Sequence, residues 1–60
     1  MLARAYFQLV DEIAAADTGA QLTALRDKIA VTEMHPLERR TLERQWRARE
    51  RMLQLEAEGL

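Results

Sequence analysis

The first quarter of the chain has apolar residues at helical spacing. Intervals of four, three and four residues separate Leu2, Tyr6, Leu9 and Ile13. A neighbouring row on the same helix adds Phe7, Val10 and Ala14. This spacing predicts an amphipathic helix over residues 2–16. Its apolar surface covers about half of the circumference, wider than the roughly 100° stripe that faces one neighbour, so we expect this helix to contact two elements.

A break in this pattern at residues 17–19 separates the first helix from a second. Thr18 followed by Gln21 fits a capping box, in which the two side chains satisfy backbone N–H groups at a helix start. One face of the following segment carries Leu22, Leu25 and Ile29. The sequence therefore predicts a helix over residues 18–33, with a mixed, solvated face at Arg26, Asp27 and Lys28.

Pro36 marks the start of the third and longest helix. Proline suits the first turn of a helix, and it keeps the preceding residue, His35, out of helical angles. Glu38 brings a negative charge to the positive end of the helix dipole. We expect this helix to span residues 36–58 and to end before Gly59. Its apolar positions form two adjacent rows, one of Leu37, Thr41, Ala48, Met52 and Leu55, and one of Leu42, Trp46 and Leu53.

These elements predict an all-α fold with a single domain over residues 1–60. Short connections favour adjacent antiparallel helices, either as a small three-helix bundle or as an open helical hairpin closed by dimerisation. A chain of 60 residues buries only about 60% of the surface that its unfolded form exposes, so self-association would add useful stability.

Composition narrows the class of protein. Apolar residues make up 48% of the chain and charged residues 32%, which is typical of amphipathic helices. The chain has no cysteine and therefore no disulfide. No run reaches the roughly 20 apolar residues of a membrane span, and the start lacks the apolar core of a signal peptide. We expect a soluble, cytoplasmic protein that does not bind membranes.

The residues that catalysis requires are scarce. The sequence has no cysteine or serine, one histidine and one lysine, and its two glycines form no phosphate-binding loop. We therefore expect no enzymatic activity, no cofactor and no small-molecule substrate. His35 lies near Glu33 and Glu38, but one histidine is too few for a structural metal site, and a turn or capping role fits it better.

Arginine is the most informative residue type. Between residues 35 and 51, six arginines oppose three glutamates, which gives this segment a charge of +3 within a chain of net charge −1. A single stripe along the third helix contains Arg40, Arg44, Arg47 and Arg51, on the side opposite the apolar rows. The stripe is either a solvated helix face or a surface that contacts phosphate or an acidic partner.

Arg49 and Trp46 belong to the apolar half of the same helix. For Arg49 we expect either an apolar stem covering the core with its head in water, or a pair with a carboxylate such as Asp11 or Glu12. For Trp46 we expect burial in the core or at the centre of an interface. Together with the arginine stripe, these two residues are the candidate partner-binding residues.

Residues 13–53 resemble small helical modules at the ends of phage single-strand annealing and related recombination proteins. The resemblance rests on Ile13-Ala-Ala-Ala-Asp-Thr18, Leu22-x-x-Leu25, Ile29, Pro36-Leu-Glu-Arg-Arg, Leu42, Trp46 and Arg49. It implies a phage or mobile-element accessory that docks on DNA-processing proteins, and it transfers no catalytic residue. The chain lacks the large annealing domain of those proteins.

Three functions fit these observations. The first is a protein-interaction or regulatory module that forms a homodimer and binds another protein, because two broad apolar faces exceed what three short helices cover. The second is nucleic-acid binding through the arginine stripe, although the acidic net charge argues against it. The third is a structural subunit of a larger assembly.

Overall fold

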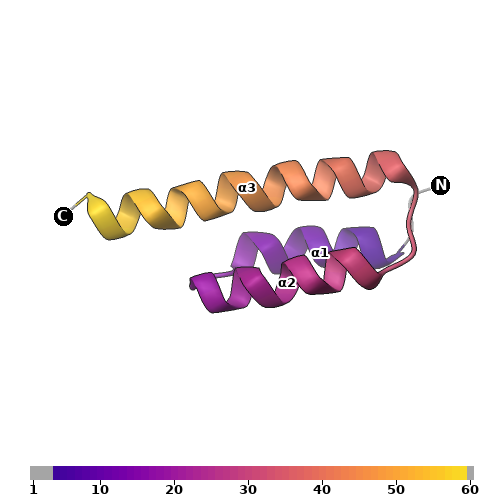
Figure 1. Cartoon of the computed structure of the whole chain (residues 1–60), viewed down its shortest axis with the longest axis horizontal. Helices are drawn as coiled ribbons and strands as arrows, with labels where there is room; N and C mark the ends of the chain where they lie inside the picture. The colour runs from indigo at the N-terminus through magenta and orange to yellow at the C-terminus, as the bar shows by residue number, and fades with distance from the viewer. Residues whose placement is uncertain (1–3, 60) are drawn as a thin grey trace.

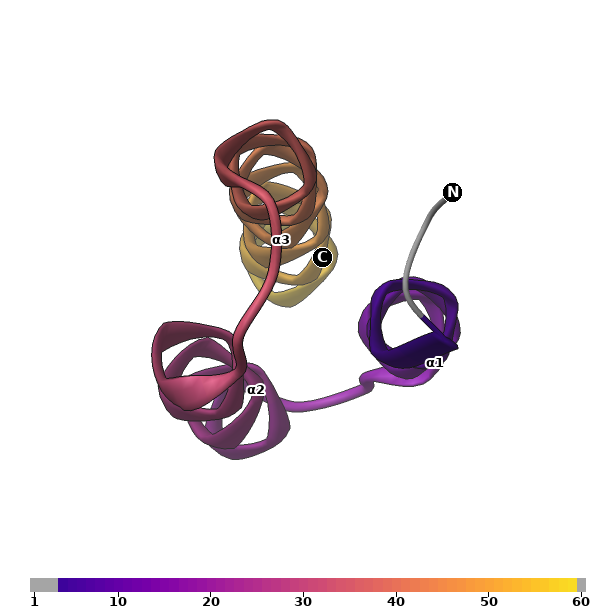
Figure 2. The same ribbon diagram turned by 90° about the vertical axis from the view of Figure 1, so that its right-hand side faces the viewer.

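Three α-helices make up the computed structural model, which describes residues 4–59. They are α1 (Arg4–Ala15), α2 (Gly19–Val31) and α3 (Pro36–Glu58). No strand occurs within this range. The three helices lie at the corners of a triangle when viewed along the bundle (Figure 2), and each contacts the other two. The all-α fold is confirmed, and it is a bundle within one chain rather than an open hairpin.

The predicted helix boundaries agree closely with the structure. The expected start of the first helix at residue 2 lies outside the described residues, and its end differs by one residue. The bounds of α3 are those predicted. The end of α2 differs by two residues, because Thr32 adopts extended angles and its N–H and hydroxyl groups both donate to the Lys28 carbonyl.

Capping boxes begin both α2 and α3. Gln21 N–H donates to the Thr18 hydroxyl at 3.2 Å, and the Gln21 side chain accepts from Thr18 N–H at 3.2 Å, as the sequence predicted. At α3, Leu37 N–H donates to His35 Nδ1 at 3.1 Å, and Glu38 accepts from His35 N–H at 3.0 Å. His35 therefore has the capping role expected of it, and Glu38, which makes the reciprocal bond, is buried.

The core lies along the axis of the triangle and draws on all three helices. Its buried side chains are Leu9, Ile13, Ala16, Leu22, Ile29, Leu42 and Trp46. Among the described residues, no buried side-chain nitrogen or oxygen lacks a hydrogen-bond partner. The core is small, and the buried polar side chains that the structure describes are all hydrogen-bonded, which a bundle of this size requires.

α3 is nearly twice as long as each of the other helices and extends past the turn that joins α1 to α2 (Figure 1). Arg49 of α3 donates a hydrogen bond to the Ala16 carbonyl, directly after the last residue of α1, so α1 ends beside residue 49 of α3. Residues 51–58, called the overhang below, therefore continue past the end of α1, and among them Leu53 still packs against the core. They add to the elongated shape of the molecule, which measures 42 × 16 × 15 Å.

The two apolar rows of α3 have different surroundings. Of its two apolar rows, only that of Leu42, Trp46 and Leu53 packs against the core. The other row is exposed along its whole length, at Leu37, Thr41, Ala48, Met52 and Leu55. The reason is geometric, since α1 and α2 cover one arc of α3 and this row lies beyond the edge of that arc.

Candidate interaction surface

Trp46 connects α3 to α2. The residue is 9% exposed, and its indole N–H donates to the Leu22 carbonyl of α2. The guanidinium carbon of Arg26 lies 5.4 Å from the ring centroid, within the range of a cation–π interaction. The predicted burial of Trp46 is confirmed, but Arg26, expected on a purely solvated face, covers its outer side.

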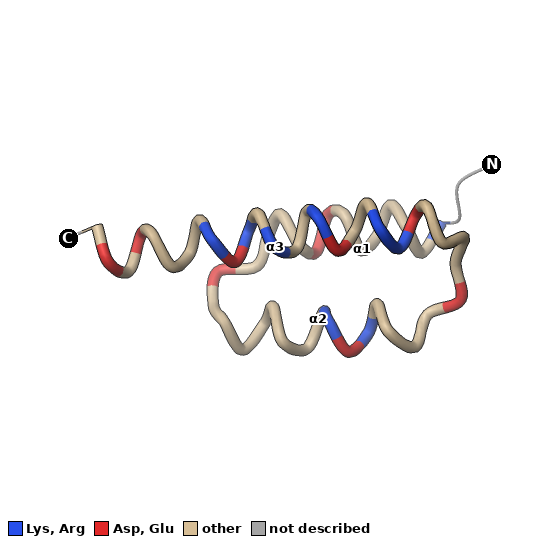
Figure 3. Tube along the Cα trace, turned by 45° about the horizontal axis from the view of Figure 1, so that its top comes forward, with Lys and Arg blue, Asp and Glu red and all other residues tan. Residues whose placement is uncertain are grey.

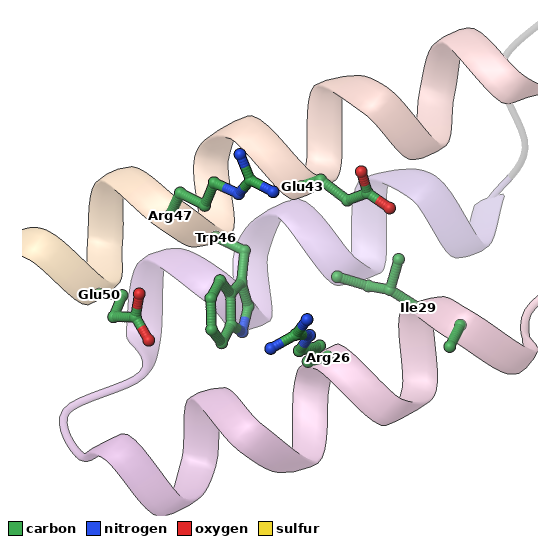
Figure 4. A pocket seen from close by; sticks show the side chains of 7 residues that line it. Arg26, Ile29, Glu43, Trp46, Arg47 and Glu50 are labelled. Carbon is green, nitrogen blue, oxygen red and sulfur yellow. The ribbon is translucent and has the colours of Figure 1, made fainter.

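A groove of about 610 Å³ opens beside this tryptophan, between α2 and α3. Figure 4 shows Trp46 pointing from α3 towards α2 and Arg26, with the charged side chains of α3 around it. The lining residues are Arg26, Ile29, Ala30, Glu43, Trp46, Arg47 and Glu50. The groove combines a small apolar floor with charges of both signs. Because the indole N–H is already bonded to Leu22, no polar group of Trp46 is available to a ligand.

Arg39 makes a contact between α3 and α2 that the sequence did not predict. It is half-buried and donates hydrogen bonds to the carbonyls of Ile29 and Thr32. These groups belong to the C-terminal end of α2, which favours a positive charge. Because residues 32–35 form a short connection, the first turn of α3 lies beside the last turn of α2. This short connection was the sequence signal from which a contact of Arg39 with the end of α2 could be predicted.

Arg49 joins α3 to the turn between α1 and α2. Its Nε–H donates to the Ala16 carbonyl at 2.9 Å, and its guanidinium lies 3.7 Å from the Asp17 carboxylate. The expectation of a half-buried arginine is confirmed, but the carboxylate is Asp17 rather than Asp11 or Glu12. Glu12 instead pairs with Lys28 at 3.1 Å, which joins α1 to α2.

The arginine stripe of Arg40, Arg44, Arg47 and Arg51 is exposed, as predicted. Figure 3 shows its positive charges along α3, with only negative charges towards the C-terminal end. The two ion pairs of residues 4–59, Lys28 with Glu12 and Arg49 with Asp17, do not involve the stripe. The stripe thus presents unpaired positive charge on the side of α3 opposite the core.

An exposed apolar face lies next to the stripe. On α3, Leu37, Met52 and Leu55 are 64%, 51% and 56% exposed, and on α1 Phe7 is 54% exposed. The Phe7 ring is held edge-on against Tyr6, with 5.4 Å between the ring centroids. Below, these four exposed residues, with Thr41 and Ala48 between them, are called the apolar face.

The two parts of the apolar face lie on the same side of the bundle. On α3, Trp46 marks the side towards α2, and helical periodicity places Met52 about 120° from it, on the side towards α1. On α1, Glu12 marks the side towards α2, and Phe7 lies about 140° from it, on the side towards α3. The face therefore runs along the outer junction of α1 and α3.

No group of three or more His, Asp or Glu side chains among the described residues could hold a metal ion. No helix between residues 4 and 59 has both the length and the apolar character to cross a membrane.

Comparisons with protein-family models, curated proteins and solved structures found no match to this chain.

Proposed function

We propose that this chain is a small, non-enzymatic protein-interaction or regulatory module that acts as a homodimer. The observation that carries the proposal is the apolar face. Four large side chains, Phe7, Leu37, Met52 and Leu55, are more than half exposed on one side of a bundle that has already formed its core. Such a face, next to a charged stripe, is typical of a protein-binding surface.

Self-association is favoured because the two large apolar side chains of the overhang that face away from the core, Met52 and Leu55, are exposed in a single chain. Met52 and Leu55 lie beyond the end of α1, where neither α1 nor α2 covers them. A second copy offers the same apolar face, and closed two-fold dimers are the commonest assembly of identical chains. Pairing these faces would bury the overhang while leaving the Trp46 groove and most of the arginine stripe accessible to another protein.

The test compares two sets of variants by size-exclusion chromatography with light scattering. The double variant Met52→Gln and Leu55→Gln removes half of the large side chains of the face. Val31→Gln is the matched control, because Val31 is 82% exposed but lies at the end of α2, away from the face. We expect the wild type and the control to have twice the 7.0 kDa chain mass, and the double variant to have the single mass with unchanged helicity.

Equal masses for all three proteins would contradict the proposal. A double variant that remains dimeric would show that the chain associates through some other surface. Circular dichroism at 222 nm separates loss of association from loss of the fold, since glutamine is a good helix former at exposed positions.

Nucleic-acid binding is the second candidate, and the unpaired arginine stripe favours it. Reversing the charge of Arg44 and Arg51 would then weaken binding and reduce its salt slope by about one for each lost phosphate contact. Titration with DNA at two salt concentrations decides the matter. Negligible affinity at physiological salt would exclude this function and leave the stripe as a contact for an acidic protein or as a solvated face.

Two narrower parts of the proposal rest on the sequence alone. An accessory role beside phage or mobile-element DNA-processing proteins comes only from the resemblance of residues 13–53. A cytoplasmic location comes only from residue usage and the absence of long apolar runs.

A further inference from the structure

The length of the apolar face limits what can cover it. α3 has 23 residues and is therefore about 34 Å long at 1.5 Å per residue. A strip one helix diameter wide, about 10 Å, has a flat area of roughly 340 Å². Even small specific interfaces bury about 600 Å² on each partner. The contact must therefore be as long as α3 and must also include the flank of α1 that carries Phe7.

The orientation of a second copy decides whether the contact includes both the length of α3 and the flank of α1. In a parallel pair, each overhang meets only the equally bare overhang of the other copy. In an antiparallel pair, each overhang lies beside the first turns of the other copy's α3 and α1, where Leu37 and Phe7 are exposed. Met52 and Leu55 of one copy then lie against these two residues of the other, so the overhang contacts both α3 and α1.

The charges of α3 favour the same orientation. The overhang carries Glu56 and Glu58 after its last arginine, whereas the first half of α3 exposes Arg40 and Arg44. Helical periodicity places Glu58 and Arg40 in the same direction, on one edge of the apolar face. An antiparallel pair brings the acidic end of each helix beside the basic beginning of the other, and a parallel pair brings like charges together at both ends.

We infer that two copies pair through antiparallel α3 helices, with each overhang seated on the junction of α1 and α3 of the other copy. The inference rests on the proposed homodimer and adds its geometry. The two-fold axis crosses α3 near its middle, around Trp46 to Ala48. Ala48 is the small residue that lets the two helices approach closely there.

Spin-label distances distinguish the two orientations directly. The chain contains no cysteine, so each single-cysteine variant carries one label per subunit. Arg40→Cys, Arg47→Cys and Gln54→Cys replace exposed residues that lie seven positions apart and face almost the same way. The three label-to-label distances in the dimer therefore have nearly the same component across the two helices. They differ only in the component along the helix axis.

The antiparallel pair predicts a short distance at position 47 and longer distances at positions 40 and 54. Two labels seven residues from the axis are separated along the helix by about 14 residues, or roughly 21 Å. The shortest distance identifies the residue nearest the axis, so the test does not depend on the register. Equal distances at the three positions, in a protein of dimer mass, would overturn the antiparallel pairing while leaving the homodimer intact. A monomer mass with no label–label distance would overturn both.

A charge-reversal pair provides a second test that needs no label. Glu58→Arg should weaken dimerisation, and adding Arg40→Glu should restore it, because the two charges then exchange places across the interface. Glu50→Arg is the matched control, since Glu50 lies near the middle of α3 on the side towards α2. We expect a several-fold rise in the dissociation constant for Glu58→Arg at low salt and little change for the control. Failure of Arg40→Glu to rescue Glu58→Arg would contradict the pairing.

Discussion

Arg39 and Arg40 are adjacent arginines with the same charge, but only Arg39 contacts another helix. Its guanidinium donates to two carbonyls at the end of α2, whereas Arg40 is exposed and has no hydrogen bond or ion pair with the described residues. Hydrogen bonds from charged donors contribute about 1.5–3 kcal/mol when buried. Arg39 is only half-buried, and ordering its side chain costs up to about 2 kcal/mol. We therefore expect Arg39→Ala to lower the free energy of unfolding by about 2 kcal/mol.

Urea unfolding followed by circular dichroism at 222 nm measures this effect. A chain of this size has a total stability of only about 3–9 kcal/mol, so the change is large, and it corresponds to a fall in Tm of about 10 °C. Arg40→Ala is the matched control and should stay within about 0.5 kcal/mol of the wild type. Arg39→Lys should retain part of the stability, since an ammonium group reaches one carbonyl but does not span two. All samples are compared at a protein concentration low enough to keep the chain monomeric, because dimerisation contributes to apparent stability and Arg40 lies in the proposed dimer contact. Equal stabilities for Arg39→Ala and Arg40→Ala would refute the capping role.

Three further substitutions test the contacts that hold the bundle together. Trp46→Ala should cost about 3–5 kcal/mol and unfold much of the protein, and an emission maximum of exposed indole in the native wild type would contradict its burial. Thr18→Ala removes the N-cap of α2 and should cost about 1 kcal/mol in thermal unfolding, so an unchanged Tm would show that this capping box contributes nothing. Arg49→Ala should destabilise the bundle by about 1–2 kcal/mol, whereas Asp17→Asn should have little effect, because Asp17 is largely exposed; the reverse order in urea titrations would assign the main role to the ion pair.

Local signals in the sequence were sufficient to place the helices. Thr18 with Gln21 and Pro36 after His35 act through bonds and steric effects within three or four residues. Their structural consequences do not depend on the rest of the fold. For the same reason, the boundaries of α2 and α3 could be predicted to within two residues.

The residues that contact other helices were harder to predict. Helical periodicity shows which side chains share a face, but not how far around a helix its neighbours reach. The arginine stripe lies directly opposite Leu42 and Trp46, so helical periodicity alone was sufficient to predict its exposure. Arg39 and Met52 lie near the two edges of the buried arc, and only the positions of α2 and α1 determined that the first is partly covered and the second is exposed.

Sedimentation equilibrium of the wild-type chain, from about 10 µM to several hundred micromolar, tests the central claim most directly. The proposed homodimer predicts that the mass rises with concentration to twice 7.0 kDa and does not rise further, since pairing of the two apolar faces closes the assembly. A fully helical protein that keeps a mass of 7.0 kDa throughout this range would contradict the account.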